Sequence, residues 1–265
     1  MIKEILITVK TYPVISTKYQ ELVCTAGIDL SSNPGKFIRI YPVPFRKLPY
    51  HKQYRKYEVW RFNLERAKDD HRIDSYHLVK PHDGGKKIKA ISTVNGWQKR
   101  KEIVLPLLAP SMCDLQKNYT ASPKSAPTLG LVKPYDVEFI VEDDTREWPE
   151  KKKHALNQFS LFQDNDLKPL EKVPFKFSYK FHCSHPECGG HKMLITDWEI
   201  YQLWRNCRDQ ALKERKPLPD AEKEAIQKVI EKYKEWMLNR DLYFYVGTVY
   251  QYGTWIIIGI FYPSL

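Results

Sequence analysis

The chain has 265 residues, of which 42% are hydrophobic and 28% are charged, and its formal net charge is +11. This balance is that of a folded globular protein, and the longest apolar run, WIIIGIFY, is far shorter than the roughly 18 residues of a membrane-spanning helix. The five cysteines are an odd and sparse set that excludes a disulfide framework and favours a cytoplasmic protein. The positive charge favours a polyanionic partner, nucleic acid or acidic lipid, and the short apolar runs predict no membrane partner.

The first sixty residues predict β-structure. Apolar residues alternate with polar ones or follow one another directly in EILITVKTY, ELVCTAGI, FIRIYPVPF and KYEVWRFNLER. Turn residues, such as those of DLSSNPGK, separate these stretches. Several short strands in close succession predict a small barrel or a strongly bent sheet. Residues 67–135 are richer in breakers, and a short helix is expected from Trp97 to Val104.

The second half of the chain mixes helix and strand signals. YDVEFIVEDD and PFKFSYKFHC predict strands, and a short helix is expected from near Pro149. Two amphipathic helices, TDWEIYQLWRNCRDQAL and DAEKEAIQKVIEKYKEWML, precede a hairpin made by LYFYVGTVY and TWIIIGIFYP. The predicted fold is therefore α+β, with a β-barrel-like N-terminal part (1–145) and a C-terminal part (146–265) that holds a zinc loop, two helices and a closing hairpin. The alternative is that both parts pack into one domain.

A Cys/His cluster follows the aromatic strand in FHCSHPECGGHKML. Cys183, Cys188 and His191 have the spacing C-x4-C-x2-H, and thiolates with an imidazole are preferred zinc ligands. A closed structural site needs a fourth ligand, which the sequence leaves open, and His185 is the candidate because it lies in the same loop. Such a Zn²⁺ ion would connect the strand at 172–181 to the helix that begins near 197. The alternative is a polar loop with two free thiols.

The segment TDWE after the loop resembles a catalytic motif but is better interpreted as a helix start. Thr196 and Glu199 have the spacing of a capping box, and Asp197 adds negative charge to the first turn. If the protein were instead a metal-dependent nuclease or a base-processing enzyme, its acidic candidates would be Glu142, Asp143, Asp144, Asp197 and Glu199.

Residues 36–61 interleave basic and aromatic side chains. Cations pair with phosphates while aromatic rings stack on bases, so this mixture predicts a surface for nucleic acid, DNA or RNA. Some of the aromatics are expected to be core residues of the strands. The candidate contact residues are Arg39, Arg46, Lys47, Tyr50, Lys52, Tyr54, Arg55 and Lys56.

Several stretches of the chain carry a family resemblance: VKTYP, CTAG, RIYPVPFR, TLGLVKP, HCSHPECGGHKMLITDWE, and FYVGT followed by WIIIGIFYP. In these stretches the chain is similar, over nearly its whole length, to an uncharacterised family of prokaryotic proteins. The resemblance implies proximity to phage-defence genes, and hence foreign nucleic acid as a target. By analogy alone, the β-rich start is similar to PUA-like and ASCH-type barrels.

These observations favour a nucleic-acid-binding protein with a structural zinc site, acting as a sensor or adaptor in prokaryotic phage defence. The first alternative is the nuclease or base-processing enzyme, which requires its carboxylates to converge in one cleft. The second alternative is a regulator whose basic surface binds an acidic protein.

Overall fold

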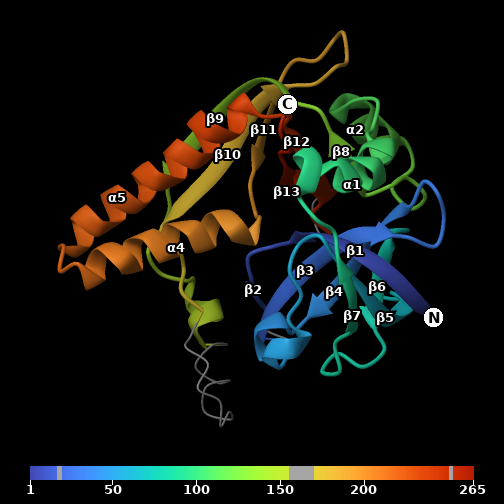
Figure 1. Ribbon diagram of the computed structural model, residues 1–265, viewed down its shortest axis with the longest axis horizontal. Helices are drawn as coiled ribbons and strands as arrows, with labels where there is room; N and C mark the ends of the chain where they lie inside the picture. Colours follow the sequence, from blue (N-terminus) through green and yellow to red (C-terminus); the bar gives the residue numbers. More distant parts are fainter. Residues whose placement is uncertain (17–19, 155–169, 251–252) are drawn as a thin grey trace.

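The computed structural model describes residues 1–16, 20–154, 170–250 and 253–265. It shows a mixed α+β protein with a closed barrel and several helices, which confirms the predicted fold class. Figure 1 shows the barrel at one end of the molecule, with a pair of long helices and further sheets beside it. No helix in these ranges is long and apolar enough to cross a membrane.

Five strands close the N-terminal barrel. Their order is β1, β3, β4, β6 and β5, and β5 pairs with β1 to complete the ring. All neighbours are antiparallel except β4 and β6, which are parallel. In β5 the apolar Trp60, Phe62 and Leu64 are buried, and the residues between them are exposed. The strand bounds are β1 (Ile2–Lys10), β3 (Gln20–Asp29), β4 (Lys36–Val43), β5 (Glu58–Arg66) and β6 (Ser75–Leu78).

Two further strands extend the barrel sheet at its sides. The short β2 (Val14–Ser16) pairs with β3, and β7 (Lys86–Ala90) pairs with β5. Since β7 ends the sheet path, one of its edges is unpaired within the described residues. Two 3₁₀ turns, η1 (Phe45–Lys47) and η2 (Tyr50–Lys52), connect β4 to β5 and lie near β7 (Figure 1).

The remainder of the chain forms two three-stranded sheets and a helical layer. One sheet has the order β11, β10, β9 and the other the order β13, β12, β8. The pair α4 and α5 lies along the β9–β10–β11 sheet (Figure 1). The bounds are β8 (Leu129–Val132), β9 (Tyr135–Asp143), β10 (Phe175–His182), β11 (His191–Leu194), α4 (Trp198–Lys213), α5 (Leu218–Ile230), the π-helical turn η4 (Glu231–Trp236), the 3₁₀ turn η5 (Met237–Asn239), β12 (Tyr243–Thr248) and β13 (Trp255–Phe261).

The helices between the two parts differ from the sequence-based expectation. The expected helix is present as α1 (Val94–Val104), continued by the 3₁₀ turn η3 (Leu105–Leu107), but its first turn has left-handed backbone at Asn95, Gly96 and Trp97. A second helix, α2 (Met112–Ala121), was not predicted. The helix expected from near Pro149 lies largely outside the described residues.

A shared apolar core connects the barrel to the rest of the chain. One buried cluster combines Leu6 and Val59 of the barrel with Leu131, Tyr245 and Phe261 of the β8–β12–β13 sheet. The pairings β9–β10 and β8–β12 also cross residue 145. The division at this residue stays a prediction, and the pairings favour the alternative of one packed unit.

Candidate functional site

Four potential metal ligands converge from two distant parts of the chain. Their ligand atoms, the Sγ atoms of Cys113, Cys183 and Cys188 and one ring nitrogen of His191, all lie within 4.8 Å of one another. The Nε2 atom of His191 is 3.3 Å from Sγ of Cys188 and 3.6 Å from Sγ of Cys113. The Sγ atoms of Cys183 and Cys113 are 3.5 Å apart. The four groups can therefore hold one metal ion.

The turn between β10 and β11 positions three of these ligands. Cys183 directly follows β10 and His191 begins β11. The backbone N–H of Cys183 donates to Sγ of Cys188 at 3.3 Å, which orients that sulfur toward the cluster. Gly190 has φ +89°, a left-handed backbone that favours glycine, so the chain can turn back into β11 within a few residues.

The start of α2 positions the fourth ligand, Cys113. Ser111 is the N-cap of this helix, and its hydroxyl accepts the backbone N–H of Asp114 at 2.9 Å. The hydroxyl of Ser184 donates to the carbonyl of Pro110 at 2.5 Å. The turn after β10 is thereby attached to the chain just before α2, which brings Cys113 to the other ligands.

The geometry fits a tetrahedral zinc ion. Zn–S bonds of about 2.3 Å and Zn–N bonds of about 2.0–2.1 Å place neighbouring ligand atoms about 3.6–3.8 Å apart. Three separations in the cluster, of 3.3, 3.5 and 3.6 Å, are close to this spacing. Three thiolates and an imidazole are also a donor set that zinc prefers, so the cluster is consistent with zinc.

The two thiols contributed by different segments have opposite pKa shifts. Burial, followed by hydrogen bonds with Cys183 and Cys188, raises the pKa of Cys113. Burial also acts to raise the pKa of Cys183, but hydrogen bonds from the backbone of His185 and from the ring of His191 lower it below the ordinary thiol value. A thiolate at Cys183 is the form that binds metal.

Sequence reasoning found three members of this cluster and missed one. Cys183, Cys188 and His191 come together as expected, whereas His185 stays outside, where its Nδ1 accepts the backbone N–H of Glu187 at 3.2 Å. Cys113 takes the fourth position. The cluster therefore connects the β10–β11 turn to α2, and not to the helix near 197 as expected.

No local signal identified Cys113, because it lies 70 residues before Cys183 in the chain. The Ser111 and Asp114 pair in SMCD is the pattern of a helix N-terminus, and it would have placed α2. A tertiary contact was still needed to bring that helix to the loop.

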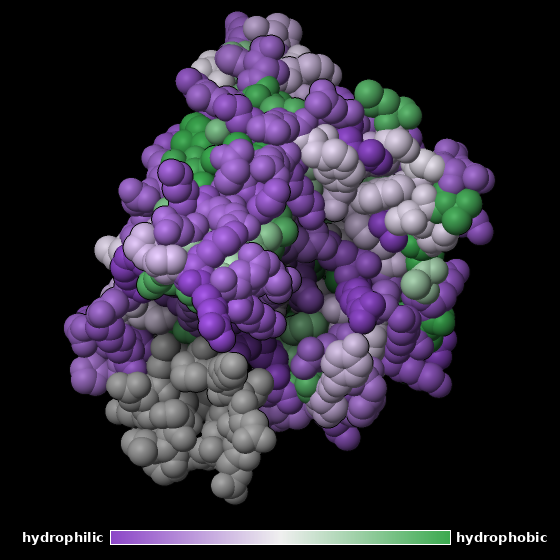
Figure 2. Space-filling view, turned by 60° about the vertical axis from the view of Figure 1, so that its left-hand side comes forward, coloured by the Kyte–Doolittle hydropathy of each residue, from purple (hydrophilic) through white to green (hydrophobic). Residues whose placement is uncertain are grey.

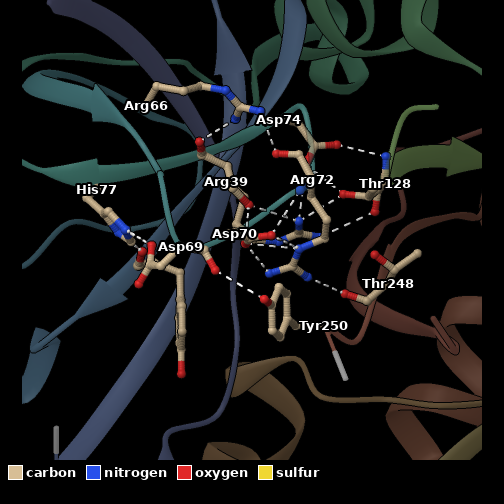
Figure 3. Close-up of polar contacts among 12 residues, drawn as sticks. Arg39, Arg66, Asp69, Asp70, Arg72, Asp74, His77, Thr128, Thr248 and Tyr250 are labelled. Atoms are coloured by element: carbon tan, nitrogen blue, oxygen red, sulfur yellow. Dashed lines mark hydrogen bonds and ion pairs between the residues drawn. The ribbon is translucent and has the colours of Figure 1, made fainter. Parts of the chain in front are cut away.

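Three of the candidate nucleic-acid contacts are buried, which corrects their predicted role. Arg39 is 2% exposed, and its guanidinium lies 3.1 Å from Oδ1 of Asp74 and donates to the hydroxyl of Thr128 at 2.9 Å (Figure 3). Tyr54 is 2% exposed and its hydroxyl bonds to Thr25. Lys56 lies in a buried ion pair. These side chains hold the fold together and face away from any polymer.

The other candidates lie at or near the surface. Tyr50 is 81% exposed and Arg55 is exposed, with Nη2 of Arg55 3.4 Å from the Tyr50 hydroxyl. Lys47 is partly exposed, and Arg46 pairs with Glu21. Lys52 donates to the carbonyl of Gly85 at 3.2 Å, in the turn that leads into β7.

The acidic candidates divide into two groups with separate partners. Glu142 lies 2.8 Å from the ammonium of Lys192, and Asp144 lies 2.9 Å from that of Lys172. Asp143 is exposed at the end of β9. Asp197 and Glu199 instead share Lys56. Within the described part of the chain, none of these carboxylates belongs to a group of three or more that could hold a metal ion.

Two family models match the chain. One, described as a domain of unknown function (DUF8757), matches residues 108–265, and the other, described as a domain of unknown function (DUF8758), matches residues 1–106. The two ranges meet within η3, just before α2. No curated protein matches the chain.

Proposed function

The chain belongs to the family described as a domain of unknown function (DUF8757), and we propose that it is a nucleic-acid-binding protein with a structural zinc site. One observation carries this proposal. A set of cations and an exposed tyrosine lies on the adjoining segments η2 and β7 of the barrel, in a chain with net charge +11. We call this set the basic edge, and its members are Tyr50, Lys52, Arg55, Lys86, Lys87 and Lys89.

Contacts between η2, β5 and β7 hold the basic edge together. Lys52 reaches the carbonyl of Gly85 at 3.2 Å, which attaches η2 to the start of β7. Glu58 of β5 accepts the backbone N–H of Arg55 at 3.0 Å and also pairs with Lys87. The side chains of Lys86 and Lys89 extend from the exposed strand β7. The cations therefore come from neighbouring segments of the chain, η2 and the edge strand β7.

The chemistry of this surface supports a polyanion. Cations outnumber the acidic groups that pair with them, which are Glu58 and Asp83. The exposed Tyr50 ring supplies a face on which a base can stack. Figure 2 shows that the face turned forward there, on the side of α4 and α5, is also largely hydrophilic, with apolar residues in small patches.

The metal cluster supports the structural part of the proposal. Four protein ligands would fill the shell of a tetrahedral ion, as in structural zinc sites, whereas catalytic sites keep a position open. A zinc ion bound there would contribute folding free energy by joining α2 to the β10–β11 turn. Cys113, Cys183, Cys188 and His191 would be its ligands.

The test is the affinity for a fluorescent single-stranded oligonucleotide, measured by anisotropy over a series of salt concentrations. For single strands, the slope of log K against log salt is about −0.7 for each phosphate that a cation neutralises. The double variant Lys86→Gln, Lys89→Gln should therefore weaken binding and reduce the slope by about 1.4. The matched control is Lys213→Gln, Lys223→Gln, which removes two exposed lysines from α4 and α5.

An unchanged slope in the β7 variant, or an equal loss in the control, would contradict the proposal. Gel analysis of the oligonucleotide after incubation with divalent metal separates binding from the nuclease alternative, because only a nuclease shortens the strand. A role in phage defence stays a prediction.

A further inference from the structure

Three aromatic rings beside the C-terminal segment form a connected row. The ring centre of Tyr262, just after β13, lies 5.1 Å from that of Trp97 in α1 and 5.6 Å from that of Trp236 at the end of η4. Trp236 is 47% exposed, and Trp97 and Tyr262 are partly exposed. Trp97 also contacts the buried Phe261, with ring centres 5.8 Å apart. The row is therefore anchored in the core and reaches solvent at Trp236.

Two arginines lie over the outer rings of this row. The guanidinium carbon of Arg240 is 4.8 Å from the ring centre of Trp236, and that of Arg100 is 4.8 Å from the ring centre of Trp97. A planar guanidinium at this distance is attracted to the face of an indole ring. Rings and cations therefore form one surface through direct contacts.

The hydrogen bonds of both arginines go to backbone carbonyls. Nε of Arg240 donates to the carbonyl of Tyr262 at 3.0 Å, and Nε and Nη2 of Arg100 donate to that of Ile91 at 3.0 and 2.9 Å. In the described part of the chain, neither guanidinium forms an ion pair with a carboxylate. Since a guanidinium has five N–H donors, both arginines keep charge and donors for an anion.

A strained turn holds Trp97 in this row. Asn95, Gly96 and Trp97 have φ of 55°, 63° and 66°, and successive left-handed residues are rare outside glycine. Gly96 lies so close to the C-terminal segment that a Cβ there would be 2.8 Å from Oγ of Ser264. Backbone strain that a fold maintains in this way concentrates at binding sites and catalytic sites.

Both family-model ranges contribute to this surface. The ammonium of Lys101 donates to the carbonyl of Ser264 at 2.9 Å, which attaches α1 to the C-terminal segment. The surface is therefore complete only when the two parts of the chain pack together. We call it the ring–arginine set, and its members are Trp97 and Arg100 from the first range and Trp236, Arg240 and Tyr262 from the second.

We propose that the ring–arginine set binds unpaired bases of a single-stranded nucleic acid, an inference that rests on the proposed function and specifies its ligand. Aromatic faces stack on bases of every type, while arginines contact the phosphates between them. A duplex hides the faces of its bases, so a single strand fits this surface better. The set also adjoins the basic edge in the chain, because Ile91, which holds Arg100, lies two residues after Lys89.

The experiment compares two fluorescent single strands of equal length, one with bases and one abasic, by anisotropy at the same salt concentration. The wild-type chain should bind the strand with bases about tenfold more tightly, because stacking adds to the shared phosphate contacts. Trp236→Ala should reduce this preference several-fold, and Trp236→Phe should restore part of it. The matched control is Tyr135→Ala in β9, which removes another aromatic residue of 47% exposure and should keep the full preference.

The abasic strand also reports on folding and on the basic edge. Trp236→Ala should retain its affinity for this strand, whereas an unfolded variant would lose both ligands. The Lys86→Gln, Lys89→Gln variant should reduce the salt slope but keep the preference for bases. Equal affinity of the wild-type chain for both strands, or an undiminished preference in Trp236→Ala, would overturn the stacking site alone. No binding of either strand would refute the proposed function, and the stacking site with it.

Two further ligands test the choice of occupant. A duplex of the same sequence should bind wild type and Trp236→Ala equally, and an equal loss with duplex and single strand would contradict stacking on unpaired bases. Tryptophan, tyrosine and arginine also suit a lipid surface. Binding of phosphatidylcholine and phosphatidylserine vesicles that depends on Trp236, without a preference for bases, would assign the rings to a membrane and overturn the proposal.

Discussion

At the scale of single residues, burial changes what a charged side chain does. Lys56 was expected to contact phosphate, but its ammonium lies between Asp197 and Glu199 and is almost inaccessible to solvent. The attraction of these carboxylates raises the pKa of Lys56 despite the opposing effect of burial, which is the largest single influence. The lysine therefore stays charged over the physiological pH range, and its ion pairs link the barrel to α4.

Removing one partner of a buried ion pair leaves the other charge uncompensated. We expect Lys56→Gln to lower the free energy of unfolding by about 3–5 kcal/mol, measured by urea denaturation. The control is Lys153→Gln, because Lys153 also pairs with two carboxylates, those of Glu147 and Glu150, but at the surface. That variant should have nearly wild-type stability. If both variants lost a similar amount of unfolding free energy, burial would not be what makes the Lys56 ion pairs strong.

At the scale of secondary-structure elements, the Cys/His cluster joins α2 to the β10–β11 turn, in addition to the apolar core that both share. Helix α2 contributes Cys113 through its first turn, and the β10–β11 turn contributes the other three ligands. A few polar contacts, such as that of Ser184 with Pro110, reinforce the connection. A metal ion would therefore strengthen an attachment of α2 that the buried Met112 and Leu115 also support.

We expect the purified protein to contain about one zinc ion per chain, and Cys113→Ser or a chelator to remove it. Hydrogen exchange should then accelerate in α2 and in residues 181–191, while the barrel strands stay protected. Metal analysis and exchange mass spectrometry measure the two effects. Cys207→Ser, at a half-buried thiol outside the cluster, should retain the metal. Zinc retained in Cys113→Ser would exclude Cys113 as a ligand.

At the scale of the whole molecule, the barrel and the remaining chain stabilise each other. Leu6 and Val59 share one core with Leu131 and Phe261. Polar contacts cross the same boundary: Arg39 reaches Thr128, and Nη1 of Arg72 donates to the carbonyl of Thr248 at 2.8 Å (Figure 3). An isolated barrel would expose this apolar surface and would lose the acceptors that Thr128 and Thr248 provide for Arg39 and Arg72.

A fragment of residues 1–106, the range matched by one family model, should therefore fail to unfold cooperatively or should melt well below the full chain. Circular dichroism during heating measures this. Adding residues 108–265 as a separate chain should restore part of the lost stability. A fragment with the melting temperature of the full chain would show that the barrel is an independent domain.

The elements with strong local patterns could be predicted from the sequence. The alternation in PFKFSYKFHC, the helical spacing after Thr196 and the closing hairpin all appear as expected, and three of the four clustered ligands lie within nine residues. These features depend on neighbours in the chain, so the sequence carries them directly.

Only the tertiary structure decided the rest. Cys113 joins the cluster through contacts that span 70 residues, and the burial of Arg39, Tyr54 and Lys56 depends on what packs over the barrel. The sequence by itself determined the charge of the chain, the barrel-forming strands and the loop with three of the four potential metal ligands. It could not determine which cations remain in water, because desolvation is a property of the assembled core, and residue type alone does not reveal it.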